Sequence, residues 1–178
     1  MPYVWYDVPG AGTLTIPDWQ YFTEQGLYIF NCIIVIFDNR FTATDIAILR
    51  NCVRFQIPAF IVRSKSGQHI QNIANDLGGG DDDDGDDSDE EGDREGELER
   101  MATARDRYLR ETRTSVARNL EEAGLLAQRV YAVDKDVLLK VVRGRTSRKC
   151  IDEEALLRDM FALANNDWAS QATDDAQA

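Results

Sequence analysis

The chain has three cysteines, one histidine and no long hydrophobic run, and each shortage argues against a class of protein. Cys32, Cys52 and Cys150 lie far apart and form no Cys-x-x-Cys pair, so we expect neither a disulfide framework nor a zinc site. His69 has no neighbouring cysteine or histidine pattern, which argues against a metal or catalytic role. The longest apolar run, residues 27–37, is much shorter than the roughly 20 residues that span a bilayer. We therefore expect a cytoplasmic protein with reduced thiols and without a secretion signal or a transmembrane helix.

The net charge of −12 comes from one acidic segment. Residues 81–99 contain 13 of the 32 acidic residues and one of the 20 basic residues, which leaves 19 of each in the rest of the chain. Because the remainder is neutral, the low isoelectric point describes this segment and not the whole surface. The sequence shows no excess of basic residues that would suit a polyanion, so we expect no nucleic-acid partner.

Strand-like and helix-like patterns alternate through the first 67 residues. The strand-like stretches are residues 3–6, 28–37 and 59–64, and the helix-like stretches are residues 17–26 and a segment that opens at Thr44 and closes at Pro58. The middle strand is almost continuously apolar, as expected of a strand that is covered on both faces of a parallel sheet. This alternation predicts an α/β fold with a mostly parallel sheet flanked by helices.

The second half of the chain follows an acidic, glycine-rich insert. Residues 78–97 cannot bury apolar surface and repel one another, so we expect them to be disordered. A helix is predicted for residues 98–127, with an apolar stripe that begins at Leu98 and Met101. A strand at residues 129–133 and a helix at 152–164 complete this half. The predicted divisions are residues 1–77, the insert 78–97, residues 98–169 and a disordered tail at 170–178.

Three predicted strands end in polar or glycine-containing loops, and in an open parallel sheet ligands bind beyond these carboxyl ends. The first loop runs from Asp7 to Gly10. It fits the Asp-x-x-Gly loop of GTPases, in which the aspartate holds Mg²⁺ through water and the glycine amide meets the γ-phosphate. A turn made of Asp, Pro and Gly at the end of any strand would give the same pattern, so both interpretations stay open.

The other two loops are candidates for contact with a purine base. Ser64 and Lys65 occupy the position of the guanine-binding Asn-Lys-x-Asp or Thr-Lys-x-Asp loop, and the alkyl stem of Lys65 suits packing along a purine ring. Gly67 stands where that loop carries a carboxylate, so a plain turn is the alternative. Asp134 ends the last predicted strand, and its alternative is a solvated turn aspartate.

A phosphate-binding loop is missing from the sequence. No Gly-x-x-x-x-Gly-Lys-Ser/Thr motif occurs, so the backbone amides, the lysine and the Mg²⁺-binding hydroxyl of that loop have no counterpart. The residue after Gly10, often a water-orienting glutamine in GTPases, is Ala11. We therefore expect weak nucleotide binding and no catalytic residue in this chain alone.

The sequence resembles the immunity-related GTPases. The resemblance is carried by VWYDVPGAGTLTIPDWQYF, IIVIFDNRFTATDIAI and the strand entering VRSKS, and it continues in ETRTSVARNLEEAGL and RVYAVDK. It implies a partial Ras-like G domain that begins just before the third strand of that fold, with GTP or GDP and Mg²⁺ as ligands.

The resemblance assigns roles only to residues that match the pattern of the family. Asp7 and Gly10 match the Mg²⁺ and γ-phosphate loop, and Lys65 matches the base-stacking lysine. Gly67 departs from the guanine-selecting aspartate, and Asp134 replaces a small polar residue. The resemblance also implies self-association and peripheral attachment to intracellular membranes. Because the central strand of the Ras-like sheet would be missing, we expect the isolated chain to be marginally stable or prone to aggregation.

Two other functions compete with this interpretation. The chain could be a non-enzymatic interaction module, a G-domain remnant that pairs with full-length relatives through its open sheet. Alternatively, the acidic segment at residues 81–97 could act as a decoy for basic proteins, although most such runs are solvated spacers.

Overall fold

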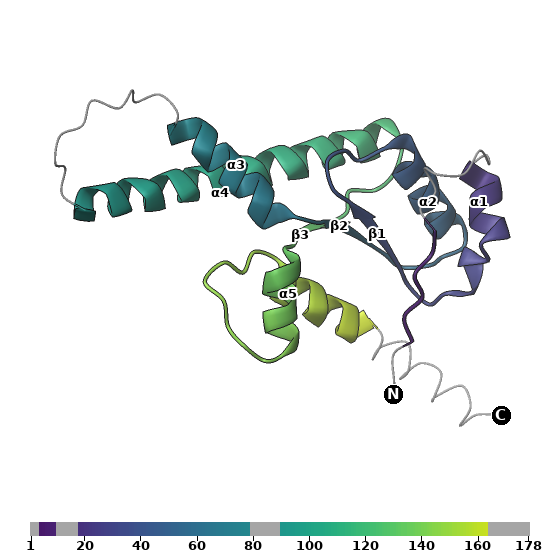
Figure 1. The fold of residues 1–178 in the computed structure, drawn as a ribbon. Coiled ribbons are helices and arrows are strands. Elements are labelled where there is room, and N and C mark those ends of the chain that lie inside the picture. The colour runs from purple at the N-terminus through teal and green to yellow at the C-terminus, as the bar shows by residue number, and fades with distance from the viewer. Residues whose placement is uncertain (1–3, 10–17, 79–89, 164–178) are drawn as a thin grey trace. The chain divides into compact units, whose positions relative to one another are not determined.

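A three-stranded parallel sheet organises the protein (Figure 1). The computed structural model describes residues 4–9, 18–78 and 90–163. The strands are β1 (Ile33–Phe37), β2 (Ala59–Arg63) and β3 (Val130–Ala132), and they lie in the order β1-β2-β3. The predicted α/β class and the parallel sheet flanked by helices are thereby confirmed, whereas the more specific Ras-like assignment stays a prediction.

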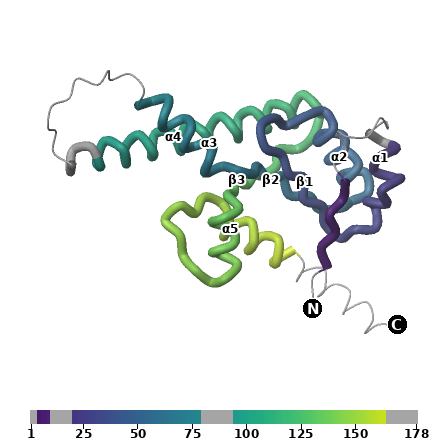
Figure 2. Tube along the Cα trace, viewed as in Figure 1, coloured from purple at the N-terminus to yellow at the C-terminus, as the bar shows by residue number. Residues whose placement is uncertain are grey.

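Helices connect the parallel strands, as the tube in Figure 2 lets the reader follow. The helix α2 (Ala43–Arg54) links β1 to β2 and begins with a capping box, in which Thr42 and Asp45 bind each other's backbone N–H groups. Between β2 and β3 the chain forms α3 (Ser66–Gly78) and α4 (Glu90–Glu122). The helix α5 (Lys135–Val142) follows β3, and residues 153–163 are also helical.

The chain forms two compact units, and each has its own apolar core. The first unit comprises Met1–Val62 and Arg113–Val130. Its main cluster joins β1, α2, β2 and the end of α4 through Val35, Phe37, Leu49, Ile61, Val116, Leu120 and Val130. A second cluster in this unit joins α1 (Asp18–Glu24), the short 3₁₀ helix η2 (Leu27–Ile29) and α2 through Tyr21, Phe22, Leu27 and Cys52.

The second unit comprises Arg63–Thr112 and Tyr131–Ala178. Its core lies where α3 packs across the middle of α4, and Figure 1 shows the two helices crossing. Buried residues of this core are Ile70, Ala74, Ala104, Tyr108 and Ala132. On α3 the apolar residues Ile70, Ile73 and Ala74 repeat at three- and four-residue intervals, which places them on one face of the helix.

The long helix differs from the expected one at both ends. It starts at Glu90 instead of residue 98, and Gly78 is the last residue of α3. The expected disorder of residues 78–97 is therefore wrong for Gly78 and for 90–97, while residues 79–89 lie outside the described part. Leu98 was expected in the core stripe but is 72% exposed. The helix ends before Gly124, whose positive φ of 69° closes it earlier than residue 127.

The first two predicted strands also need correction. Within the described part of residues 3–6, positions 4–6 form no strand, and their side chains are exposed, with Trp5 at 64%. Without a paired neighbour an isolated extended stretch has no ladder to stabilise it. The second strand is confirmed only at 33–37, because residues 27–29 form η2. Ile36 is 63% exposed, so this strand is not covered on both faces. The predicted tail at 170–178 lies outside the described residues.

Candidate functional site

The loops that leave β2 and β3 are joined by backbone hydrogen bonds within the second unit. The Val133 N–H donates to the Arg63 carbonyl at 2.9 Å, and the Ser66 N–H donates to the Val133 carbonyl at 3.1 Å. These bonds continue the strand pairing past the ends of both strands. The carboxyl ends of β2 and β3 therefore hold two of the three loops selected from the sequence, Ser64–Gly67 and Asp134, next to each other.

The loop after β2 is short because α3 begins at once. Ser64 is half-buried, and Lys65 is exposed with a left-handed backbone (φ 55°) that non-glycine residues seldom adopt. Ser66 then opens α3, so the expected loop at Ser64 to Gly67 is wrong at its last two residues. The strained conformation at Lys65 turns the chain sharply from strand into helix. The lysine is therefore exposed at the carboxyl end of β2.

Ser66 anchors the start of α3 to α4. Its hydroxyl is buried, lies 3.0 Å from the Tyr108 hydroxyl and 3.2 Å from the Arg63 carbonyl oxygen, to which it can donate. The Arg63 guanidinium lies 4.5 Å from the centre of the Tyr108 ring and also donates to the Thr112 hydroxyl. Because these groups bond one another in a buried place, they fix the loop that carries Lys65.

Asp134 begins the helix α5. Its carboxylate Oδ1 accepts the Asp136 N–H at 3.0 Å, as an N-cap aspartate does. Its own N–H donates to Oε1 of Glu153 at 2.8 Å. The residue is half-buried and held at both its backbone and its side chain, so it is more constrained than the solvated turn that the sequence left open.

Two consecutive carboxylates support this loop, and neither was among the residues predicted for the site. Glu153 is fully buried, and its second oxygen, Oε2, accepts the Ile151 N–H at 2.6 Å. Asp152 is buried as well and accepts the Ala132 N–H of β3 at 3.1 Å. An acidic pair directly before an apolar helical pattern is a recognisable helix start, but sequence alone does not say which backbone groups it reaches.

Gly67 lies against Asp134. A Cβ atom added to Gly67 would stand 2.8 Å from Oδ2 and 3.2 Å from Cγ of Asp134, closer than real Cβ atoms approach an oxygen. The absence of a side chain at position 67 is therefore what lets the Asp134 carboxylate lie beside the start of α3. Gly67 and Asp134, which were selected from the sequence as parts of separate loops, are thus in contact.

Asp7 belongs to the first unit and is described there. It is exposed in the non-helical, non-strand segment 4–9, in which Val8 packs against the cluster around Phe22, and the Pro9 carbonyl accepts the Tyr21 hydroxyl. Gly10 lies outside the described residues. The structure places Gly67 against Asp134, with Lys65 two residues before Gly67 in the chain. The assignment of Asp7 and Gly10 to a phosphate loop stays a prediction.

Within the described ranges no group of three or more His, Cys, Asp or Glu side chains gathers as a metal site would require. A single exposed carboxylate at Asp7 could contact a metal that phosphates already hold, but it does not build a site by itself.

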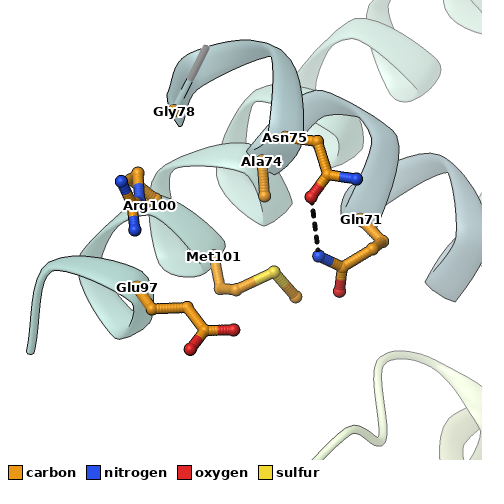
Figure 3. A pocket seen from close by; sticks show the side chains of 7 residues that line it. All are labelled: Gln71, Ala74, Asn75, Gly78, Glu97, Arg100 and Met101. Carbon is orange, nitrogen blue, oxygen red and sulfur yellow. Dashed lines mark hydrogen bonds between the residues drawn. The ribbon is translucent and has the colours of Figure 1, made fainter. Parts of the chain in front are cut away.

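A separate surface cavity lies between the second half of α3 and the start of α4 (Figure 3). Its volume is about 350 Å³, and its lining mixes amides, one Arg, one Glu and apolar groups: Gln71, Ala74, Asn75, Gly78, Glu97, Arg100 and Met101. Gln71 donates to Asn75 at 3.0 Å, which uses part of the polar capacity. The lining contains no nucleophile paired with a base, so the cavity offers no chemistry comparable to the strand-end loops.

Comparisons with known proteins leave the family open. None of the described helices combines the length and the apolar character needed to cross a bilayer. The chain matches no protein-family model, and it matches no curated protein.

Proposed function

We propose that this chain carries the base-binding side of a guanine-nucleotide site, in a GTPase-type domain that binds and hydrolyses GTP weakly or not at all on its own. The observation that carries the proposal is that the loop containing Lys65 lies beside the start of the loop containing Asp134, at the carboxyl ends of two adjacent parallel strands. Ligands of open α/β sheets bind at this edge because loops and helix N-termini converge there. Two helices, α3 and α5, begin within these loops.

The chemistry of the two side chains suits a purine. The alkyl part of Lys65 can lie along an aromatic ring while its ammonium stays in water. The carboxylate of Asp134 can accept N–H groups at the edge of that ring. The left-handed backbone at Lys65 supports the same assignment, because strained residues that the surroundings hold in place cluster at ligand sites.

We assign Asp7 to Mg²⁺ through water, and Gly10 and Ser64 to the surroundings of the nucleotide, on the resemblance alone. When bound, Mg²⁺ would neutralise phosphate charge. Since the sequence has no Gly-x-x-x-x-Gly-Lys-Ser/Thr motif, we expect binding in about the millimolar range, where only about 4 kcal/mol of binding free energy is available.

A titration followed by nuclear magnetic resonance tests this proposal. GDP and ADP are added to the ¹⁵N-labelled full chain, with and without Mg²⁺. We expect GDP to shift the signals of residues 64–67 and 134–136 at lower concentration than ADP, and Lys65→Ala to weaken GDP binding about tenfold. Lys149→Ala, which changes another exposed lysine, is the matched control and should bind GDP as the unaltered chain does. The absence of any GDP-dependent shift in these loops would overturn the proposal. Micromolar, Mg²⁺-dependent binding of GDP would contradict the expectation that binding is weak.

A second candidate function is an interaction module that pairs with intact relatives. The observation in its favour is β1, which lies at one end of the strand order and pairs on only one side within the described part of the chain. A strand at the end of a sheet can accept another strand through its backbone, and the exposed Ile36 side chain adds apolar surface on the sheet face beside that edge. Co-purification with an intact relative, lost in an Ile36→Lys variant that still folds, would support this function. A monomer that captures no relative would count against it.

A further inference from the structure

The cavity between α3 and α4 has a charged end and an amide end (Figure 3). Glu97 and Arg100 lie three positions apart on α4, so their side chains share one helical face, with Cβ atoms about 5 to 6 Å apart. Gln71 and Asn75 come from α3 and lie at the other end. The cavity volume of about 350 Å³ falls within the range of sites that hold small molecules.

Gly78 makes room for the guanidinium of Arg100. A Cβ atom added to Gly78 would stand 3.3 Å from Nη1 and 3.6 Å from Cζ of Arg100. The guanidinium therefore lies against the last residue of α3, where the end of a helix favours a cation. Among the described side chains that line the cavity, the only hydrogen bond joins Gln71 to Asn75, so Glu97 and Arg100 do not pair with each other. Both charges can therefore meet a ligand.

The surface between the two ends is apolar. Ala74 is buried, and the partly buried Met101 packs against the same core cluster. A methionine side chain is flexible and adapts its shape to an apolar group beside it. At the amide end, the bond from Gln71 Nε2 to Asn75 Oδ1 leaves the carbonyl oxygen of Gln71 and the N–H groups of Asn75 available. An acceptor beside a donor suits a primary carboxamide, which carries one of each.

We propose that this cavity binds a free α-amino acid whose linear side chain ends in a carboxamide, as that of glutamine does. A ligand with a single charge would be attracted by either Glu97 or Arg100 and repelled by the other. A zwitterion carries both charges on one carbon, so its carboxylate can bind Arg100 while its ammonium donates to Glu97. The site lies apart from the loops after β2 and β3 and does not depend on the proposed nucleotide binding.

The three recognised groups can be removed from the ligand one at a time. L-glutamine has all of them, glutaramic acid lacks the ammonium, 4-aminobutanamide lacks the carboxylate, and L-norleucine lacks the carboxamide. Each is titrated into the ¹⁵N-labelled full chain and followed by nuclear magnetic resonance. We expect L-glutamine to bind in about the millimolar range and to shift the signals of residues 71–78 and 97–101. Each of the other three should bind at least about threefold more weakly, a modest factor because the charged side chains are exposed.

Variants connect each group of the ligand to its residue. Arg100→Gln should bind L-glutamine and 4-aminobutanamide alike, because the carboxylate has lost its partner. Glu97→Gln should bind L-glutamine and glutaramic acid alike for the corresponding reason. Arg110→Gln and Glu99→Gln change exposed residues of the same helix that do not line the cavity. These matched controls should keep the order of affinities of the unaltered chain.

The unaltered chain alone decides the inference, even where a variant fails to fold. If L-glutamine shifts no signal of residues 71–78 and 97–101 up to about 50 mM, the cavity is not a site for this ligand. If glutaramic acid or 4-aminobutanamide binds as tightly as L-glutamine, the zwitterion is not what the cavity recognises. Either result would overturn the inference and leave the nucleotide proposal as it stands. A folded Arg100→Gln variant that still discriminates against 4-aminobutanamide would overturn it as well.

Discussion

The loops after β2 and β3 and the segment at residues 4–9 differ in what holds them. Buried polar groups hold the two loops. One of them is the Glu153 carboxylate, which accepts the N–H groups of Asp134 and Ile151. The segment 4–9 has exposed side chains at most positions, and it contacts the rest of its unit through Val8, the bond from Tyr21 to Pro9 and the ring of Tyr6 against Phe30. The loops after β2 and β3 are fixed by hydrogen bonds, whereas segment 4–9 has mostly exposed side chains.

This difference bears on how each region could bind a ligand. A loop that hydrogen bonds already fix loses little conformational freedom on binding, whereas the exposed side chains of segment 4–9 lose theirs when they bind. Ordering costs on the order of 1 to 2 kcal/mol for each residue fixed. We therefore expect selectivity for the base to come from the Asp134 loop of the isolated chain, and any contact through Asp7 to need help from phosphates or a partner.

Removing the buried carboxylate should give the largest effect. Glu153→Ala would leave two N–H groups without their acceptor in a buried place, and we expect it to lower the free energy of unfolding by about 3 kcal/mol. Urea denaturation followed by circular dichroism measures the loss. Glu154→Ala changes the exposed neighbour and should stay within about 0.5 kcal/mol. Equal losses in the two variants would show that Glu153 does not hold the loop.

The cluster beneath segment 4–9 should respond to alkaline pH. Burial, with a smaller contribution from Cys32, raises the pKa of the Cys52 thiol to about 12. The unfolded chain would release this proton near its ordinary pKa of 9.0, while the folded chain keeps it. The stabilisation that the Cys52 thiol contributes to folding is thus fully present below about pH 9. It falls as the pH rises towards 12, by at most about 1.4 kcal/mol per pH unit.

Denaturation at several pH values between 8 and about 11 measures this slope. In Cys52→Ala the contribution of the thiol disappears, so its stability should fall less steeply over the same range. A variant with the same slope as the unaltered chain would show that Cys52 is not the group responsible, and that other groups govern the alkaline response of the first unit.

The predicted strands and helices succeeded where the pattern was strong and local. The apolar run before Phe37 correctly indicated β1, and the pattern that opens at Thr44 indicated α2, although Thr42 caps this helix two residues earlier. The start of α3 was missed because Gly67 looked like a turn residue, although Ile70, Ile73, Ala74 and Leu77 repeat with helical spacing behind it. The same local emphasis missed α5, which Asp134 caps.

The candidate site could be selected from the sequence only as separate loops. Lys65 and Asp134 were identified by their positions after strands, but their order along the chain gives no distance between them. The contact of Gly67 with Asp134 spans more than 60 residues and depends on how β2 and β3 pair. Glu153 could not be assigned at all, because its role follows from burial against two backbone groups and not from any motif.

The segment 4–9 should tolerate substitution, which gives the smallest expected effect. Trp5 is 64% exposed, so Trp5→Ala should change the free energy of unfolding by no more than about 0.5 kcal/mol. Leu49→Ala, in the core of the same unit, should cost about 2 to 5 kcal/mol and serves as the reference. Urea denaturation measures both. A loss of unfolding free energy in Trp5→Ala that approaches the loss in Leu49→Ala would mean that the segment is paired or buried in solution, as a strand at residues 3–6 would be. The contrast with the Asp134 loop would then disappear.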